Sequence, residues 1–454
     1  MVVHPVDYRY GSENMRRVFC REQWLERALL VEAALAQAHA EVGNVPKKAA
    51  DYISKRASTK FVKLSRVDEI EREIGHETMA VVRAFSEACD PYGGYIHIGA
   101  TSNDITDSVL ALQIRDALSI IKRDLVELEG ILATSAERYK DLVCLGRTHG
   151  VAALPMPFGF KFANWASEVM RHLERLEQSS PRIVNGKMSG AIGTMAGLGP
   201  KADRIQELTM KRLDIRPAQI TTQVVARDGL AELVCLMGMI SSTLDKMANE
   251  VRNLQRTEIL EVEEPFEEER QVGSSTMAHK RNPVKSEKVC GLARVVRGHA
   301  TTILENVVLE HERDLTNSSY ERNVIPELCL LLDEQLKTVK LIFKGLRTYP
   351  ENMKRNLDRT KGLILSESVI MALVRKGADR QWAHEKVRRC AMKAWNQQVD
   401  FGKVLEEDPS VRKYLDAKEL RSALDPEGYL GNSKEQIDRV VKEVRHYLSK
   451  IRIS

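Results

Sequence analysis

Residues 104–139 read DITDSVLALQIRDALSIIKRDLVELEGILATSAERY, and the pattern in this stretch is the strongest indication of the fold. Its apolar side chains recur at alternating steps of four and three residues, at Ile114, Leu118, Ile121, Leu125, Leu128 and Leu132. That heptad spacing predicts one long helix that packs along one face against other helices. At 1.5 Å per residue, the helix would be about 50 Å long.

Further apolar patterns in the middle of the chain predict four more long helices. They run over Phe158–Leu176, Leu230–Leu254, Ser286–Glu310 and Leu328–Leu346. Helices of this kind pack side by side, so we expect an all-α fold built around a central long-helix bundle. The helices would overhang a compact monomer, and we therefore expect subunits to share the bundle; a monomeric helical array is the alternative.

The flanking segments differ from the bundle and suggest three domains. Residues 1–97 hold shorter helical stretches, residues 98–348 form the bundle domain, and residues 349–454 form a C-terminal helical domain. Between Val184 and Pro200 the sequence is rich in glycine and small residues, which predicts a loop. It lacks the pattern of a phosphate-binding P-loop, so this common type of nucleotide site is disfavoured.

Composition is that of a globular protein with a large aliphatic core. Of 454 residues, 43% are hydrophobic but only 5% are aromatic, and the net charge of +5 is too small to indicate a nucleic-acid partner. The seven cysteines are odd in number and include no C-x-x-C pair, which makes a disulfide framework or a zinc ribbon unexpected. No apolar run approaches the roughly 20 residues that span a bilayer. We expect a cytoplasmic protein without a membrane partner.

The stretch QVGSSTMAHKRNPVKSE, residues 271–287, interrupts the helices with small, polar and basic groups. Small residues let a loop move and let its N–H groups approach a ligand. A serine surrounded by such amides and by Lys280 could act as an alkoxide. The alternative is that Ser274 and Ser275 only cap the following helix.

Two other polar stretches lie near ends of the first long helix. GRTHG, residues 146–150, places His149 away from any apolar stripe, where it could exchange a proton near neutral pH or simply lie at the surface. GATSNDITD, residues 99–107, contains Thr101 and Ser102 at a helix start, which is an ordinary N-cap and also a possible anion site.

The stretch HERDLTNSSYER, residues 311–322, could converge on a phosphate through Arg313, Ser318 and Arg322, or form a solvated charged face. The zinc pattern H-E-x-x-H is absent, because no second histidine follows His311 and Glu312 at the required spacing. Antiparallel helices bring alternate ends to one pole of a bundle, so these distant polar stretches could meet there.

The motif GSSTMAHKRNP at 273–283 resembles the signature of the fumarase/aspartase superfamily of β-eliminating lyases, Gly-Ser-Ser-x-Met-Pro-x-Lys-x-Asn-Pro. Ala278 replaces the usual proline of that signature, from which we expect a more flexible loop. Ser274, Lys280 and Asn282 are retained.

Within that superfamily nearly the whole chain is most similar to the adenylosuccinate lyase family. The resemblance is carried by GHETMA at 75–80, GATSNDITDS at 99–108, GRTHG at 146–150, TTQVVARD at 221–228, KRNPVKSEK at 280–288 and the C-terminal segment 362–387. Two positions depart from the commoner pattern, since Gly75 and Lys288 stand where many members have arginine.

The resemblance implies the three-domain fold of the superfamily and a β-elimination. Ser274 would remove a proton from the succinyl Cβ, and His149 would protonate the departing nitrogen. Lys280 and Asn282 would stabilise the carbanion. His76 would support the acid, and Glu287 would orient Lys280.

The resemblance also implies the groups that hold the substrate. The succinyl carboxylates would be held by Thr101, Ser102, Thr148 and Gln223. The 5′-phosphate would be held by Arg9, Tyr10, Arg313, Ser318 and Arg322, with Glu77 and Lys288 as further substrate contacts. No cofactor or metal is expected, because fixed donors stabilise the charge. The partners expected are a nucleotide substrate and a homotetramer with shared active sites, and no nucleic acid.

Three alternatives remain open. A sister argininosuccinate lyase would share the fold and chemistry, but its substrate carries no phosphate for Arg9, Arg313 and Arg322. A non-catalytic bundle protein would be signalled by loss of His149, Ser274 or Lys280. A cycloisomerase of the same superfamily would not be expected to keep both His149 and Ser274.

Overall fold

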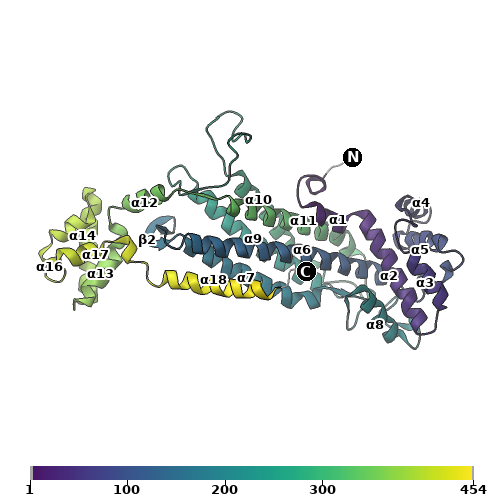
Figure 1. Cartoon of the computed structure of the whole chain (residues 1–454). Helices are drawn as coiled ribbons and strands as arrows, with labels where there is room; N and C mark the ends of the chain where they lie inside the picture. The colour runs from purple at the N-terminus through teal and green to yellow at the C-terminus, as the bar shows by residue number, and fades with distance from the viewer. Residues whose placement is uncertain (1–3, 452–454) are drawn as a thin grey trace. The chain divides into compact units, whose positions relative to one another are not determined.

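The computed structural model describes residues 4–451, and most of them are helical (Figure 1). The five long helices predicted from the apolar patterns are confirmed. They are α6 (Ser102–Arg138), α7 (Gly159–Ile183), α9 (Asp228–Leu254), α10 (Val284–Glu305) and α11 (Thr316–Lys344). With 37 residues, α6 is about 55 Å long. None of the described helices is long and apolar enough to cross a membrane.

The boundary between α10 and α11 differs from the prediction. The fourth helix ends at Glu305 and not near Glu310, and the fifth already begins at Thr316. Asp314 causes the early start, because its Oδ1 accepts hydrogen bonds from the Thr316 amide at 2.7 Å and from the Thr316 hydroxyl at 2.5 Å. The polar stretch around Arg313 is therefore a helix start.

The chain folds into two compact units, each assembled from separated stretches of sequence. The first unit comprises residues up to Leu125, Arg171–Leu244 and Gly291–Lys337, and the second comprises Val126–Met170, Asp245–Cys290 and residues from Thr338 onward. The boundaries fall inside the five long helices, so each of these helices contributes residues to both units.

The first unit adds shorter helices to its share of the bundle. They are α1 (Glu13–Phe19), α2 (Arg21–Glu41), α3 (Lys47–Arg56), α4 (Leu64–Ile74), α5 (Glu77–Ala88) and α8 (Ala202–Leu213), with 3-10 turns η1 (Pro5–Asp7), η2 (Gly93–Tyr95) and η3 (Ala196–Leu198). α2 packs against both α3 and α8. Its buried alanines, such as Ala34 and Ala38, permit this close approach on more than one face.

The glycine-rich segment predicted as a loop wraps around a buried ion pair at the start of α6. Its two-residue strand β3 (Asn185–Gly186) pairs in parallel with β4 (Arg216–Pro217). The ammonium of Lys187 is fully buried and lies 2.6 Å from Oδ1 of Asp104. Asp104 also accepts hydrogen bonds from the backbone amides of Thr101, Ser189 and Gly190. The segment therefore holds the first turn of α6 in place through its contacts with Asp104.

The second unit contains the remaining strands and a C-terminal group of helices. The strands are β1 (Val143–Thr148), β2 (Val151–Pro157), β5 (Val262–Glu263) and β6 (Arg347–Thr348). The helices are α12 (Pro350–Asp358), α13 (Ser366–Arg375), α14 (Arg380–Gln397), α15 (Phe401–Glu406), α16 (Pro409–Arg412), α17 (Ala417–Ala423) and α18 (Ser433–Lys450), with 3-10 turns η4 (Leu363–Leu365) and η5 (Pro426–Gly428).

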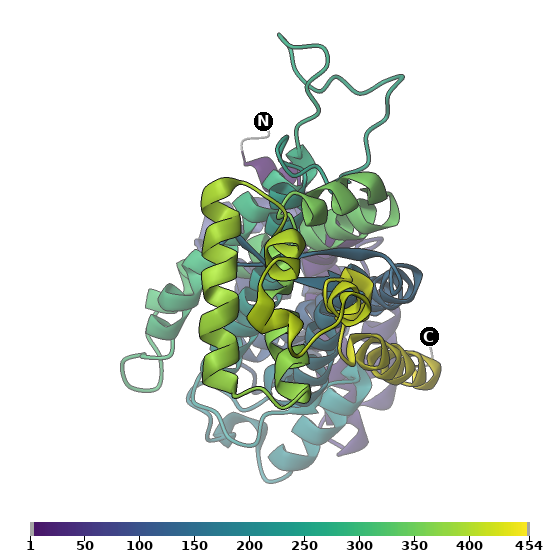
Figure 2. The same cartoon turned by 90° about the vertical axis from the view of Figure 1, so that its left-hand side faces the viewer.

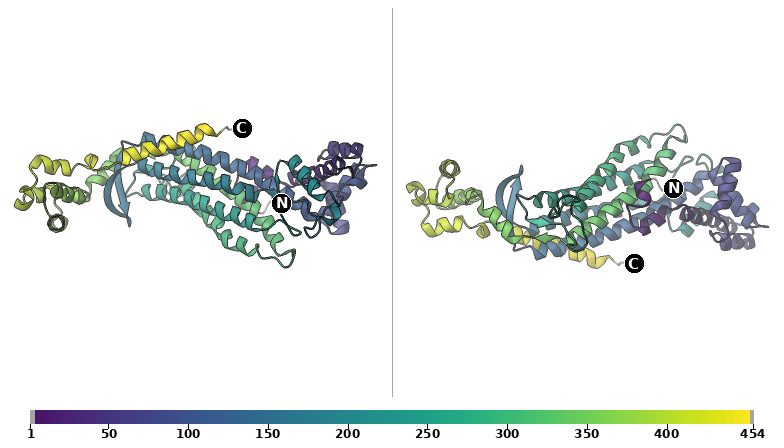
Figure 3. Two further views of the ribbon diagram at one scale, coloured as in Figure 1. Left: turned by 90° about the horizontal axis from the view of Figure 1, so that it is seen from below. Right: turned by 90° about the horizontal axis from the view of Figure 1, so that it is seen from above.

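The scarce aromatic residues concentrate in this second unit. Phe162 lies at its centre, with its ring centroid 5.3 Å from those of Phe158 and Trp165 and 5.7 Å from that of Phe343. The last helix, α18, runs beside the C-terminal part of α6 (Figure 3), where Lys140 pairs with Asp438 at 2.5 Å. Aromatic side chains thus cluster in this part of the core, and the Lys140–Asp438 pair lies nearer the surface.

Glu129 on α6 has no hydrogen-bond partner for its carboxylate among the described residues. From this we predict an unusual pH dependence of stability. The residue is fully buried. Burial raises the pKa of Glu129 to about 9. An acid whose folded-state pKa is raised costs no stability below about pH 4.5, and the cost grows as the pH rises toward 9.

Replacing Glu129 with leucine is therefore expected to increase stability, by about 3 kcal/mol at pH 7. The increase should be larger at pH 8 than at pH 5, which denaturation curves at the two pH values would measure. Glu137→Gln is the control: it changes an exposed carboxylate of the same helix that pairs with Arg445, so it should show no gain in stability that grows from pH 5 to pH 8. A Glu129→Leu protein that unfolds more easily than the wild type at pH 8 would contradict the explanation.

Candidate active site

A cavity of about 700 Å³ in the first unit collects six of the residues predicted to form the site. These are His76, Glu77, Ser102, Arg313, Ser318 and Arg322. They belong to the starts of helices α5, α6 and α11, whose first turns all border the cavity. Helix N-termini carry partial positive charge and free N–H groups, so this convergence favours an anionic ligand.

Four arginines border the cavity, and three of them, Arg21, Arg227 and Arg322, form ion pairs with carboxylates, while Arg313 forms none among the described residues. Arg227 is buried and forms ion pairs with Asp107 at 2.9 Å and Glu321 at 3.0 Å. Burial lowers the pKa of Arg227, but the two carboxylates together hold that pKa above its usual range. Arg313 donates to the neutral side chain of Gln223 at 2.9 Å, and burial lowers the pKa of Arg313. Arg313 is thus a partly buried cation that an anionic ligand would neutralise.

The predicted residues at the start of α5 are oriented by their own helix. Nδ1 of His76 accepts a hydrogen bond from the Met79 amide at 3.3 Å, and this bond caps the helix. With Nδ1 as the acceptor, the proton of the neutral imidazole lies on Nε2. Glu77, the next residue, forms an ion pair with Arg322 at 2.8 Å. An anionic ligand would compete with Glu77 for that guanidinium group.

Four other predicted residues of this unit do not line the cavity. Thr101 lies next to it, where its amide is held by Asp104 at 2.8 Å. Gln223 reaches the site through its bond to Arg313. Arg9 and Tyr10 lie in the turn after η1, and the structure does not bring them to the cavity.

In the second unit, His149 occupies the tip of a β-hairpin that the sequence analysis did not predict. The strands β1 and β2 pair antiparallel with Thr148 opposite Val151, so His149 and Gly150 form a two-residue turn. Their φ angles are 54° and 75°. Positive φ at both positions is the signature of a type I′ turn, for which asparagine and glycine are the preferred residues. Histidine is thus an unusual choice for the turn, and it presents an exposed imidazole.

The hydroxyl of Ser274 accepts two backbone hydrogen bonds within the predicted catalytic loop. They come from the amides of Met277 at 3.0 Å and Thr276 at 3.3 Å. The same two donors would stabilise an alkoxide at this oxygen. They also close a tight turn, so the structure assigns Ser274 to a turn within the loop and not to the cap of helix α10.

The ends of this loop are joined by close contacts. Asn282 donates from its side-chain amide to the carbonyl oxygen of Gly273 at 3.0 Å. A Cβ atom at Gly273 would lie 2.1 Å from the carbonyl oxygen of Lys280, so only glycine fits there. The loop therefore brings Ser274, Lys280 and Asn282 together, and it extends away from the helices (Figure 2).

The remaining predicted residues of the second unit are less closely linked. Glu287 lies exposed in the first turn of α10 and forms no ion pair with Lys280 in the described part of the chain. Lys288 is half-buried beside it, and Thr148 is exposed at the end of β1. Lys280 itself has an exposed side chain, near the point where the ends of the loop meet.

Sequence reasoning missed several groups that shape the cavity of the first unit. The buried charge network of the cavity consists of Asp107, Arg227 and Glu321. Asn317 also lines the cavity, and its buried side-chain oxygen has no hydrogen-bond partner among the described residues. One signal was available, because Arg227 and Asp107 lie within stretches already noted for their family resemblance. The pairing itself joins residues 120 positions apart, and no local pattern reveals it.

Comparisons with known proteins show which proteins the chain is similar to. A family model described as a lyase matches residues 2–298, and a model described as the adenylosuccinate lyase C-terminus matches residues 362–440. Adenylosuccinate lyase from Pyrococcus abyssi is 54% identical over 98% of both chains. That from Methanocaldococcus jannaschii is 46% identical over 98% of this chain and 97% of its own.

Solved structures show a similar fold. A fumarate lyase from Mesorhizobium matches with a TM-score of 0.88 and 33% identity, covering 95% of this chain and 98% of its own. A 3-carboxy-cis,cis-muconate lactonizing enzyme from Pseudomonas putida matches with a TM-score of 0.89 and 32% identity, covering 98% and 99%. The fold is therefore shared by enzymes with different reactions, and the site residues must distinguish between them.

Proposed function

We propose that the chain, which belongs to the adenylosuccinate lyase family of the fumarase/aspartase superfamily, is a carbon–nitrogen lyase of purine biosynthesis. It would release fumarate from adenylosuccinate to give AMP, and from the corresponding imidazole-carboxamide ribonucleotide SAICAR to give AICAR. The observation that carries the proposal is Arg313. Among residues 4–451 this partly buried cation has no carboxylate partner, and it lies where three helix N-termini border a cavity of nucleotide size.

The proposed reaction needs one base and one acid. Ser274, as an alkoxide, takes the proton from the succinyl Cβ, and the C–H electron pair is held as a carbanion next to a carboxylate. That pair then forms the double bond of fumarate while the C–N bond breaks. The nitrogen keeps the C–N pair and receives a proton from His149. The two amides on Ser274 support this role, since they stabilise the negative oxygen.

The other predicted residues would hold charge in place. Lys280 and Asn282 lie in the same loop as Ser274 and would stabilise the carbanion. His76 would support His149, and Glu287 would orient Lys280. The carboxylates would be held by Thr101, Ser102, Thr148 and Gln223. The phosphate would be held by Arg9, Tyr10, Arg313, Ser318 and Arg322, with Glu77 and Lys288 as further contacts.

The decisive experiment is product analysis with purified protein and two substrates. We expect fumarate and AMP from adenylosuccinate, and no turnover of argininosuccinate, which carries no phosphate. Arg313→Gln should raise KM for adenylosuccinate about 10- to 100-fold, because a charge-assisted hydrogen bond to phosphate is lost. The kcat should change little. Cleavage of argininosuccinate alone, or cycloisomerisation without fumarate release, would overturn the assignment.

Arg83→Gln is a matched control for the arginine substitution. Arg83 lies exposed on α5 and does not line the cavity, so its loss should leave KM unchanged. An equal rise in KM for both variants would show that general charge and not phosphate binding is measured.

We further propose a homotetramer whose subunits share active sites. The long helices support it, because they expose apolar side chains such as Met239, Val295 and Leu304, which are 44%, 41% and 54% accessible. Light scattering should give a mass of about 205 kDa, four times the 51.3 kDa of one chain. A monomeric mass at micromolar concentration, with full activity, would contradict a shared site.

A further inference from the structure

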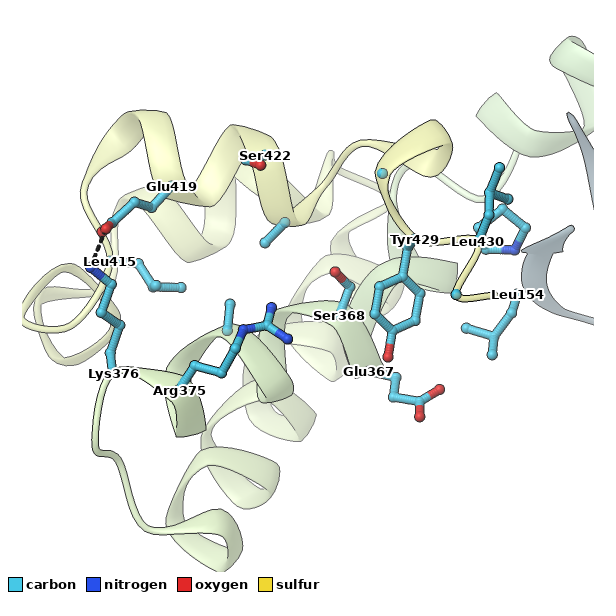
Figure 4. A pocket seen from close by; sticks show the side chains of 15 residues that line it. Leu154, Glu367, Ser368, Arg375, Lys376, Leu415, Glu419, Ser422, Tyr429 and Leu430 are labelled. Atoms are coloured by element: carbon cyan, nitrogen blue, oxygen red, sulfur yellow. Dashed lines mark ion pairs between the residues drawn. The ribbon is translucent and has the colours of Figure 1, made fainter. Parts of the chain in front are cut away.

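A second cavity, of about 760 Å³, lies in the second unit and plays no part in the proposed reaction. It is bordered by helices α13 and α17, by the turn at residues 428–431 and by strand β2 (Figure 4). Leu154 and Leu430 lie at one end of it, near Tyr429, and Leu415 lies at the other. The cavity thus has apolar walls as well as the polar groups described next.

Ser368 offers the cavity a hydroxyl that the protein leaves available to a ligand. The residue is only 4% exposed, yet its hydroxyl has no hydrogen-bond partner within residues 4–451. Figure 4 shows the hydroxyl directed into the cavity. The hydroxyl oxygen is not among the fully enclosed atoms that lack a partner, so it is open to the cavity and available to bond to a ligand there.

Two further donors, one at each side of Ser368, face the same space. Arg375 is on the same helix and forms no ion pair in the described part of the chain, and its guanidinium end extends toward Ser368 (Figure 4). The hydroxyl of Tyr429 lies on the other side. A guanidinium and two hydroxyls form a donor set that suits a carboxylate.

Negative charge in the same cavity limits what the ligand can be. Glu367 has no ion-pair partner among the described residues, and its charge together with burial raises the pKa of Tyr429, although Arg375 opposes this. At the far end Lys376 and Glu419 form an ion pair and neutralise each other. The two remaining charges, Arg375 and Glu367, also sum to zero. A phosphate dianion would meet an unpaired carboxylate, whereas a ligand with one charge of each sign would match both groups.

We propose that this cavity is a binding site for a small zwitterion of the α-amino-acid class. The carboxylate of the ligand binds Arg375 and Ser368, its ammonium group binds Glu367, and its side chain packs against Leu154 and Leu430. The volume is ample for the largest amino acid side chain.

The position of the site gives it a route to the proposed acid. Leu154 and Pro155 belong to β2, and Pro155 pairs with Leu145 across the same hairpin whose turn carries His149. A ligand packed on this strand restrains the hairpin, and so changes the mobility of His149. This effector role, unlike the binding itself, rests on the proposed lyase function.

Binding is tested without any turnover. Each of the twenty common amino acids, at millimolar concentration, is added singly to the full-length protein, and thermal shift is followed by calorimetry. We expect at least one to bind, and to bind at least tenfold more weakly when its amine is acetylated or its carboxylate is amidated. A result in which none of the twenty binds, or in which the blocked forms bind equally well, would overturn the proposal.

Paired variants locate the site and separate it from the reaction. Arg375→Gln and Glu367→Gln should each weaken binding at least tenfold, while Arg380→Gln, on the neighbouring helix and outside the cavity, should not. In the wild type, the bound amino acid should change the kcat for adenylosuccinate. An unchanged kcat would remove the effector role, and unchanged binding by the Arg375 and Glu367 variants would remove the site itself. A protein inactive on adenylosuccinate would refute the lyase proposal and leave the binding result standing.

Discussion

Ser274→Ala should lower the kcat for adenylosuccinate by about 10³- to 10⁴-fold and leave KM within a few-fold of the wild type. Alanine removes the only oxygen that the loop turn places on the two amides of Thr276 and Met277. A carbon acid beside a carboxylate is weak, so its proton needs a positioned base, and water in the emptied site is a poor substitute. Steady-state kinetics and a single-turnover measurement of fumarate release would establish the loss.

The neighbouring residue provides the control for this substitution. Ser275→Ala changes an exposed hydroxyl in the same loop and should keep at least a third of the activity. Ser274→Thr keeps the oxygen that closes the turn, and partial activity in that variant would separate loss of the base from loss of loop structure. If Ser274→Ala retains more than a tenth of the wild-type kcat, another group is the base.

His149→Asn should lower kcat by about 10²- to 10⁴-fold without weakening the fold. The residue adopts φ of 54° in a type I′ turn, and asparagine is among the best residues for that conformation. The variant therefore removes the proposed acid while preserving the hairpin that carries it. Its melting temperature should equal or exceed that of the wild type.

A second substitution shows whether the imidazole or the turn matters. His149→Val forces a β-branched side chain into positive φ, so it should lower both stability and activity. Loss of activity in the asparagine variant with an unchanged melting temperature assigns the effect to proton transfer. Full activity of His149→Asn would mean that the nitrogen is protonated by a different group, with His76 the first to examine.

The helices were predictable because their signal is local and long. The heptad spacing of α6 continues over many turns, and each apolar position in it, from Ile114 to Leu132, is buried in the structure. The hairpin of β1 and β2 was missed for the opposite reason. Its strands include Gly146 and two prolines, at 155 and 157, which strands usually avoid, and its turn is His-Gly and not Asn-Gly.

In the candidate site, too, the features with a local sequence signal were predictable and those that depend on distant contacts were not. Short motifs identified the loop of Ser274 and the helix starts that carry His76, Ser102 and Ser318, because each motif is contiguous in sequence. The neutralisation of Arg227 by Asp107 and Glu321, which leaves Arg313 as the available cation, depends on contacts between residues 94 and 120 positions apart. Local periodicity carries no information about such pairs, and only the folded chain shows them.

The type I′ turn at His149 has an evolutionary consequence. In most enzymes a catalytic side chain lies where its replacement also disturbs packing, so loss of function and loss of fold tend to be inherited together. At the proposed acid His149, a single base change from a histidine to an asparagine codon produces a residue that the backbone conformation prefers. A lineage released from selection for the reaction could therefore lose the activity in one mutation and keep a well-folded helical bundle. A non-enzymatic descendant could arise from such a protein.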